Sequence, residues 1–353
     1  MQQGHRGGVD SQIGAVLVQR RDLIGRDEPL DVAGSDHEPV EDVLRECRDH
    51  VVDRADLLAT GRIDRHSALE DLIRDRQPFV HHRHTTGMTR VAVVGHVEWV
   101  DFVSVPHLPV HGKILNADSA FARAGGGGGV AATVLAEFGA EVDFYCALGR
   151  DANGEAAVAQ FEARGVHLHV AWRDEPTRRA VTFLEPGGER TIVTLGDRLQ
   201  PSGSDQLDWE RVGDAASVYF TAGDDDALRE ANRSPFVVAS PRARDVLEHK
   251  DARMYALVFS EGDEDESAWA RRVASHTRLL VATEGSRGGR WWGESEGRWP
   301  AAPLPGPPGD TYGAGDSFAA AFTLGLGRGD SIADAAKLGA EAGALAFTRV
   351  GAP

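Results

Sequence analysis

Short apolar segments alternate with longer segments of mixed polarity from about residue 88 onward. The nearly continuous apolar runs are 91–95, 141–148, 218–220, 236–238, 256–259 and 279–282. Runs of this kind are typical of strands that are buried on both faces. In the segments between them, apolar residues recur every three or four positions, as is typical of helices. The alternation therefore predicts an α/β fold whose central, mostly parallel sheet is covered by helices on both faces.

Two other segments have the pattern of half-buried strands. Residues 103–120 alternate loosely and contain two prolines, which favours edge strands or a hairpin. Residues 180–184 and 190–195 alternate with a period of two on either side of a Pro186-Gly187-Gly188 turn. We therefore predict a small β lid formed from about residues 103–120 and 177–195.

Residues 1–87 have a different composition from the rest. They hold seven of the 14 histidines and a single aromatic residue, Phe79. Two interpretations stay open. Residues 1–87 are either a helical or disordered extension, or the result of a start codon assigned too far upstream, with translation actually beginning at Met88. We favour the second, because Met88 leads directly into the first buried-strand pattern.

Composition and charge exclude several classes of partner. The chain has 353 residues, 41% of them hydrophobic and 26% charged, enough for one large or two ordinary globular domains. Its net charge of −17 argues against nucleic acid and against an anionic membrane surface as partners. An anionic substrate would need a local site of basic residues or backbone donors, or a bound cation.

The two cysteines, Cys47 and Cys146, are far apart and lack metal-ligand spacing, so neither a disulfide framework nor a zinc site is expected. No apolar run reaches the roughly 18 residues of a membrane span, and no secretory signal pattern is present. These features predict a cytoplasmic protein.

The strongest chemical signal lies near the C-terminus, where residues 310–316 read DTYGAGD and an alanine-rich helix pattern follows. Small residues at 313–315 allow backbone N–H groups to converge at the start of a helix, where an anion is favoured. Asp316 places a carboxylate beside this anion site, as general-base catalysis would require. The alternative is an ordinary helix in which Asp316 is the N-cap.

A run of five glycines, 125–129, precedes a helix pattern at 130–138. Such a run is compatible with a flexible linker or with close approach of the backbone to a ligand. A dinucleotide-binding loop is a third interpretation, but no short strand leads directly into the glycines.

The motif around Asp316 resembles, at each constrained position, the second signature of the ribokinase family, the PfkB-type sugar and nucleoside kinases. The glycine run and the later Gly139 and Gly149 resemble the family's first signature. Val130 stands where the family has an asparagine, and Gly127 where it often has a lysine. The resemblance covers residues 88–353 and implies a three-layer αβα sandwich with a β lid.

The resemblance also implies roles for individual residues. It assigns catalysis to Asp316 and to an anion hole formed by Gly313, Ala314 and Gly315. It assigns substrate binding to Glu98, Asp101, Gly126, Gly127, Gly128 and Arg190, and nucleotide binding to Thr283, Gly285, Gly288 and Thr311. It assigns magnesium binding to Asp263, although an acidic loop of this kind is often only solvated.

Two of these assignments keep alternatives. Ungapped counting places Val100 at the family's sugar-binding aspartate, so Glu98 and Asp101 are both candidates, and strand alternation turns them to opposite faces. Arg190 lies near the active site in one interpretation and is a solvated hairpin arginine in the other.

The expected activity is ATP-dependent phosphorylation of a hydroxyl group on a sugar, a sugar-like compound or a nucleoside, with Mg²⁺. The resemblance also implies that Asp310 and Thr311 either shape the loop or form a monovalent-cation site, as in some relatives. The expected partners are the small-molecule acceptor and, through the lid, a second subunit. Two alternatives remain: a sugar- or nucleotide-binding regulator without turnover, and a hydroxymethylpyrimidine- or pyridoxal-type kinase.

Overall fold

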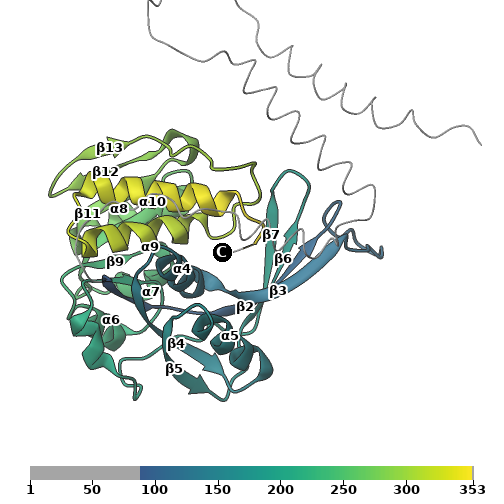
Figure 1. Cartoon of the computed structure of the whole chain (residues 1–353), viewed down its shortest axis with the longest axis horizontal. Coiled ribbons are helices and arrows are strands. Elements are labelled where there is room, and N and C mark those ends of the chain that lie inside the picture. The colour runs from purple at the N-terminus through teal and green to yellow at the C-terminus, as the bar shows by residue number, and fades with distance from the viewer. Residues whose placement is uncertain (1–87, 352–353) are drawn as a thin grey trace, which may run out of the picture. The chain divides into compact units, whose positions relative to one another are not determined.

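The computed structural model describes residues 88–351 (Figure 1). The expectations for residues 1–87 lie outside the described residues. Within the described part, each apolar run of the sequence forms a strand of one large sheet, as predicted. No helix among these residues is both long and apolar enough to cross a membrane.

The large sheet has nine strands in the order β13-β12-β11-β10-β9-β8-β1-β4-β5. Its strands from β11 to β5 are parallel, whereas β12 and β13 extend it as an antiparallel hairpin. The strands are β1 (Arg90–Val94), β4 (Glu141–Gly149), β5 (His167–Arg173), β8 (Ser217–Phe220), β9 (Val237–Ala239), β10 (Met254–Ser260), β11 (Thr277–Thr283), β12 (Gly289–Gly293) and β13 (Gly297–Trp299).

Helices cover both faces of this sheet, and a separate apolar cluster fills each interface. One cluster joins α4, α9 and α10 to side chains such as Val93 and Phe144, and the other joins α6, α7 and α8 to Val94 and Phe220. The helices are α4 (Gly126–Glu137), α5 (Ala152–Glu162), α6 (Asp225–Ala231), α7 (Arg244–Leu247), α8 (Glu264–Arg272), α9 (Ala314–Gly327) and α10 (Ile332–Phe347), with short 3-10 turns η1 (Trp209–Asp214), η2 (Pro241–Ala243), η3 (Ala274–His276) and η4 (Gly285–Arg287).

A second sheet of four strands forms the lid beside the carboxyl ends of the parallel strands (Figure 1). Its order is β3-β2-β6-β7, with β2 (Glu98–Ser104), β3 (Ser119–Gly125), β6 (Arg179–Leu184) and β7 (Arg190–Leu195). The strands β2 and β3 flank the segment 105–118 rather than fill it, so the lid begins earlier than residue 103. The two prolines lie in this connection, where no ladder hydrogen bond is needed.

Helix α4 begins at Gly126 rather than at Val130, where the sequence pattern starts. Four consecutive glycines form its first turn, although glycine is a poor helix former. Tertiary hydrogen bonds to the first three amides compensate: Gly126 donates to Tyr312 Oη, and Gly127 and Gly128 donate to His96 Nε2 and His96 O.

Candidate active site

The chain enters helix α9 through a left-handed residue, Gly313, with φ of 72°. The amides of Gly315 and Asp316 have no acceptor among the described residues. A Cβ atom at Gly315 would meet nothing within 4 Å, so the space over the helix start is open. Free N–H groups and the positive end of the helix dipole make this space an anion site.

The carboxylate of Asp316 lies at the edge of this anion site and is only 5% exposed. The guanidinium of Arg242 forms a bidentate ion pair with this carboxylate. Its Nε donates to Oδ1 and its Nη2 donates to Oδ2, each at 2.9 Å. Tyr219 Oη donates to Oδ1 at 3.2 Å. The nearby charge of Asp316 raises the pKa of Arg242, so this guanidinium is a permanent cation.

The loop before Asp316 is fixed by a second buried carboxylate. Asp310 accepts hydrogen bonds from the amides of Tyr312 and Gly351, each at 2.6 Å, and is 3% exposed. The Tyr312 hydroxyl in turn accepts the amide of Gly126, which ties this loop to the start of α4. Val130 packs against Gly313, where an added Cβ would lie 3.0 Å from Val130 Cγ1.

Gly127 lies in direct contact with the Arg242–Asp316 ion pair. A Cβ atom there would be 2.7 Å from Arg242 Cδ and 3.1 Å from Asp316 Oδ1. Glycine is thus needed at this position for close approach and not for backbone conformation. The structure therefore brings Gly126, Gly127 and Gly128 together with the loop at 313–316.

The lid places its two candidate carboxylates on opposite faces. Strand β2 has no bulge in its register, so Glu98 shares the buried face with Val100 and Phe102, while Asp101 faces the other way. Glu98 Oε1 lies 3.3 Å from Arg178 and 3.9 Å from His96 Nε2, and burial raises the pKa of Glu98. Asp101 is paired with Arg179 at 2.7 Å.

Arg190 extends from β7 on the same face of the lid as Leu184, its partner in the ladder. Arg190 is exposed as a residue, but partial desolvation of its guanidinium lowers the pKa of Arg190, and the charges of Asp310, Arg242 and Asp316 act on it. Its guanidinium is therefore within the electrostatic reach of the loop that precedes α9.

The nucleotide-side candidates form a tight turn after β11. Gly285 and Gly288 have φ of 59° and 83°, and Glu284 N donates to Gly288 O at 2.7 Å. A Cβ at Gly288 would collide with Trp299 O at 2.1 Å. Thr283 ends the strand and donates to Phe259 O at 3.3 Å, and Thr311 is exposed in the loop that precedes α9.

Asp263 follows β10 and is the N-cap of α8, because its Oδ1 accepts the amide of Glu266. Its Oδ2 has no partner among the described residues and is exposed. No group of three or more His, Cys, Asp or Glu side chains that could hold a metal occurs in residues 88–351. A magnesium ion here would therefore depend on Asp263, substrate phosphates and water, a ligand set that Mg²⁺ commonly accepts.

Sequence reasoning missed the basic and aromatic residues that lie around Asp316, Glu98 and the start of α4. They are His96, Arg178, Arg198, Tyr219, Arg242 and Tyr312. Arg242 could have been found, because it follows β9 at the carboxyl edge of the sheet, where ligands of such sheets bind. Arg198 lies in an irregular segment after β7, and no sequence pattern marks it.

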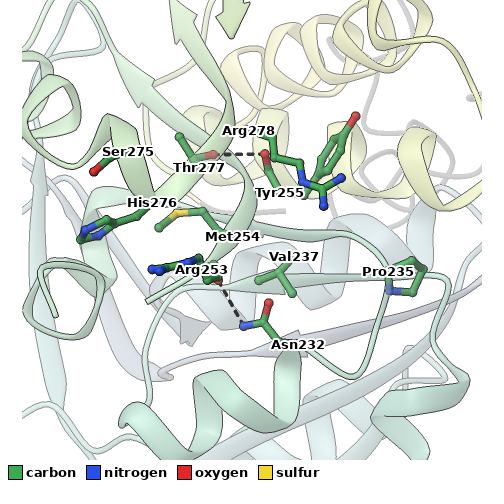
Figure 2. A pocket seen from close by; sticks show the side chains of 10 residues that line it. All are labelled: Asn232, Pro235, Val237, Arg253, Met254, Tyr255, Ser275, His276, Thr277 and Arg278. Carbon is green, nitrogen blue, oxygen red and sulfur yellow. Dashed lines mark hydrogen bonds between the residues drawn. The ribbon is translucent and has the colours of Figure 1, made fainter. Parts of the chain in front are cut away.

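Neither of the two most distinct cavities contains Asp316. One, of about 270 Å³, is shown in Figure 2. It includes Val237, Met254 and Thr277, the first residues of their strands, so it lies at the amino edge of the sheet. The other, of about 470 Å³, lies between the hairpin turn at 184–188 and the segment 308–310.

Comparison with curated proteins finds relatives that phosphorylate sugars. The chain is 28% identical over 262 residues to an ATP-dependent ribose-1-phosphate kinase of Halopiger xanaduensis, covering 67% of this chain and 84% of the relative. It is also 28% identical over 278 residues to acarbose 7(IV)-phosphotransferase of an Actinoplanes species, covering 74% and 92%.

Comparison with solved structures finds the same fold. Arabidopsis thaliana ribokinase complexed with ribose and ATP matches with a TM-score of 0.62 and 22% identity, covering 75% of this chain and 95% of that one. The microbiome-derived acarbose kinase Mak1 matches with a TM-score of 0.62 and 27% identity, covering 75% and 94%. These matches confirm the predicted ribokinase-like fold.

The comparison with family profiles covers nearly all of the described chain. The profile described as pfkB family carbohydrate kinase matches residues 88–235 and 245–353. This match includes the glycine turn of α4, the four lid strands and the DTYGAGD motif before α9. The chain therefore belongs to the pfkB family of carbohydrate kinases.

Proposed function

We propose that this kinase transfers the γ-phosphoryl group of ATP to a hydroxyl group of a sugar, a sugar-like compound or a nucleoside, with Asp316 as general base. The observation that carries the proposal is the buried carboxylate beside two free amides at the start of α9. Phosphoryl transfer needs positioning and charge stabilisation more than covalent chemistry, and this arrangement supplies both.

The hydrogen bonds of Asp316 leave room for an acceptor hydroxyl. A carboxylate has about four lone-pair sites. Arg242 and Tyr219 use both sites of Oδ1, whereas Oδ2 accepts only from Arg242. We therefore propose that the acceptor hydroxyl donates to Oδ2. Its oxygen bonds to the γ-phosphorus as the bond to the bridging oxygen of ADP breaks, and its proton passes to Asp316.

On the donor side, ATP supplies the phosphoryl group and Mg²⁺ supplies positive charge against the phosphates. Asp263 keeps one carboxylate oxygen available for that ion, directly or through water. The turn from Thr283 to Gly288 is proposed to lie under the nucleotide, with Thr311 close to it. Because both oxygens of Asp310 already accept amides, we propose that Asp310 shapes the loop rather than holding a monovalent cation.

On the acceptor side, we propose Glu98 rather than Asp101 as the lid carboxylate that binds substrate hydroxyls. Glu98 faces Arg178 and His96, whereas Asp101 faces away with Arg179. The amides of Gly126 to Gly128 are already engaged within the protein, so this turn contributes shape and close approach more than free donors.

The decisive experiment measures ADP formation over a panel of sugars, sugar derivatives and nucleosides, for the natural enzyme and for Asp316→Asn. The amide retains the size of the carboxylate but is not a base. We expect kcat to fall by about 10²–10⁴-fold, the usual contribution of general-base catalysis. Asp251→Asn, which removes a carboxylate from an exposed loop, is the matched control and should retain full activity.

The same panel tests the alternative of a non-catalytic binding protein. The bidentate contact of Arg242 favours that alternative, because it occupies two lone pairs of the base. Binding of sugar or nucleotide by calorimetry, without turnover of any acceptor, would support it. Turnover that Asp316→Asn leaves intact would contradict the proposed role of Asp316.

A further inference from the structure

Three arginine side chains from separate segments lie around Glu98 and Asp316, since one pairs with each carboxylate and the third donates to the backbone of the second arginine. Arg178 directly precedes β6, Arg198 lies after β7, and Arg242 lies in η2. The charges of all three lower the pKa of His96, whose burial lowers it most, so this histidine is neutral beside them. The same three charges lower the pKa of Glu98, against the larger effect of burial, which raises it.

This cluster has more positive charge than its carboxylates match. Glu98 pairs with Arg178 and Asp316 pairs with Arg242. Arg198 has no ion pair within 4 Å in the described part of the chain, and its guanidinium donates only to Arg242 O at 2.8 Å. Burial has the largest effect on the pKa of Arg198 and lowers it. The charge of the exposed Asp245 raises this pKa, whereas the charges of Arg178 and Arg242 lower it further.

Gathering like charges in a partly buried place is costly unless an opposite charge compensates. Overall composition does not account for the cluster, since the chain carries a net charge of −17. The Nε atom of Arg178 is also buried without an acceptor among residues 88–351. This site thus has cationic donors that a bound anion would satisfy.

Unpaired polar atoms lie at the carboxyl ends of the three neighbouring strands. They are His96 Nδ1 after β1, Thr221 Oγ1 after β8 and Ser240 Oγ after β9, each buried and without a partner among the described residues. Because His96 Nε2 accepts the Gly127 amide, Nδ1 of the neutral ring carries the proton and is a donor. Buried donors and acceptors of this kind normally have partners. A ligand rich in hydroxyl groups would provide them.

We propose that the acceptor of this enzyme is an anionic sugar or polyol, whose phosphate or carboxylate group is bound by Arg178, Arg198 and Arg242. This inference rests on the proposed kinase activity and specifies its substrate class. Guanidinium groups bind both anions in the same bidentate manner, so phosphate and carboxylate share the recognition chemistry.

Arg242 links this anion site to catalysis. Its guanidinium has five N–H donors, of which Nε and Nη2 are used by Asp316. The two donors on Nη1 and the second donor on Nη2 remain available for the anionic group of the phosphoryl acceptor. The anion would thus orient the acceptor against the same arginine that positions the base.

The test compares acceptors that share a carbon skeleton, with and without an anionic group: ribose, ribose 1-phosphate, ribose 5-phosphate and ribonate, and the corresponding glucose series with gluconate. Steady-state kinetics of ADP formation are measured for the natural enzyme, Arg178→Gln and Arg198→Gln. The control is Arg253→Gln, because Arg253 is exposed at the amino edge of the sheet and, like Arg198, donates only to backbone carbonyls.

We expect kcat/KM for at least one anionic acceptor to exceed that of its neutral parent by tenfold or more. Each cluster variant should lower that value by about ten- to hundredfold, the contribution of hydrogen bonds to a charged group. The KM for ATP and the activity of Arg253→Gln should stay unchanged. The comparison of phosphate esters with the sugar acids identifies which anion is bound.

Several outcomes would overturn this inference while the proposed kinase activity stands. One is that neutral sugars are phosphorylated as well as or better than the matched anions. Another is that the cluster variants raise the KM for ATP and leave the acceptor preference unchanged, which would assign the arginines to the nucleotide. If no acceptor gives turnover that depends on Asp316, the kinase proposal itself fails.

Inorganic phosphate provides a measurement that does not depend on the folding of a variant. In the natural enzyme it should inhibit competitively against the anionic acceptor at constant ATP. Inhibition that is competitive only against ATP would contradict the proposed subsite.

Discussion

Two buried titratable side chains, His96 and Glu98, lie 3.9 Å apart beneath the lid. Burial disfavours the charged form of each, so the pKa of His96 falls well below 6.5 and that of Glu98 rises above 4.5. His96 is 2% exposed and holds the amide of Gly127 with an uncharged nitrogen. The neutrality of His96 is therefore part of how the glycine turn of α4 is held.

This neutrality makes stability depend on pH. Between the lowered folded pKa of His96 and its unfolded value of 6.5, the unfolded chain binds more protons than the folded one. The contribution of His96 is thus fully present above pH 6.5 and is lost as the pH falls below it, by up to about 1.4 kcal/mol per pH unit. Glu98 acts in the opposite sense, because its stabilising contribution is lost as pH rises through its raised pKa.

The variant His96→Gln isolates the histidine contribution, since the glutamine amide oxygen can accept the Gly127 amide but does not titrate in this range. We expect its free energy of unfolding, measured by urea denaturation from pH 7.5 to 5.5, to decline less steeply than that of the natural enzyme. His107→Gln, at an exposed position, should keep the natural slope. Equal slopes in His96→Gln and the natural enzyme would contradict the neutral state of His96.

At the scale of single elements, helix α4 shows where sequence patterns were informative and where they were not. Apolar periodicity predicted a helix from residue 130, and the family signature marked the glycines before it. The actual start at Gly126 depends on His96 and Tyr312, which are distant in sequence, and no local pattern contains that information. Asp316 is a similar case. Its motif was recognised in the sequence, but no local pattern predicted its contact with Arg242.

Replacing Gly127 with alanine should separate activity from stability. The added Cβ would lie 2.7 Å from Arg242 Cδ, which belongs to a flexible side chain, so the fold can adjust. Alanine also favours helix over glycine by about 1 kcal/mol. We expect a thermal midpoint equal to or above that of the natural enzyme, and kcat/KM at least about tenfold lower, because Arg242 and Asp316 lose their geometry.

The matched control is Gly213→Ala in η1, where the nearest atom to a new Cβ is 3.9 Å away. It should preserve both activity and thermal midpoint. Full activity of Gly127→Ala would show that the close approach of this turn to the Arg242–Asp316 pair has no part in catalysis.

At the scale of the whole molecule, alternation of apolar strands and helices was sufficient to predict a parallel sheet covered by helices on both faces, whereas the pfkB family was predicted from the two glycine-containing motifs. The regular spacing of buried strands is a local property, whereas the arginine cluster arises from three segments that meet only in the folded chain. The predicted family and enzyme class are confirmed. The assignment of individual site residues, the ion and the oligomeric state stays a prediction.

The lid supports the last of these predictions, a homodimer. Its outer face has an apolar stripe across β2, β6 and β7, formed by Val103, Val181, Phe183, Val193 and Leu195. Val193 and Leu195 are 47% and 44% exposed, and β7 is an edge strand with all six residues exposed. Exposed apolar faces and unpaired edges favour association with another sheet.

We therefore expect light scattering after size-exclusion chromatography to give the mass of two chains for the natural enzyme. The double variant Val193→Lys and Leu195→Lys places two charges on the outer face of the lid, and it should shift the enzyme to the mass of one chain. Arg229→Glu and Arg233→Glu, on exposed positions of α6 and the loop after it, are a control for charge change outside the lid. A natural enzyme that is monomeric at tens of micromolar would contradict the proposed lid interface, as would a dimer that the lysine variant leaves intact.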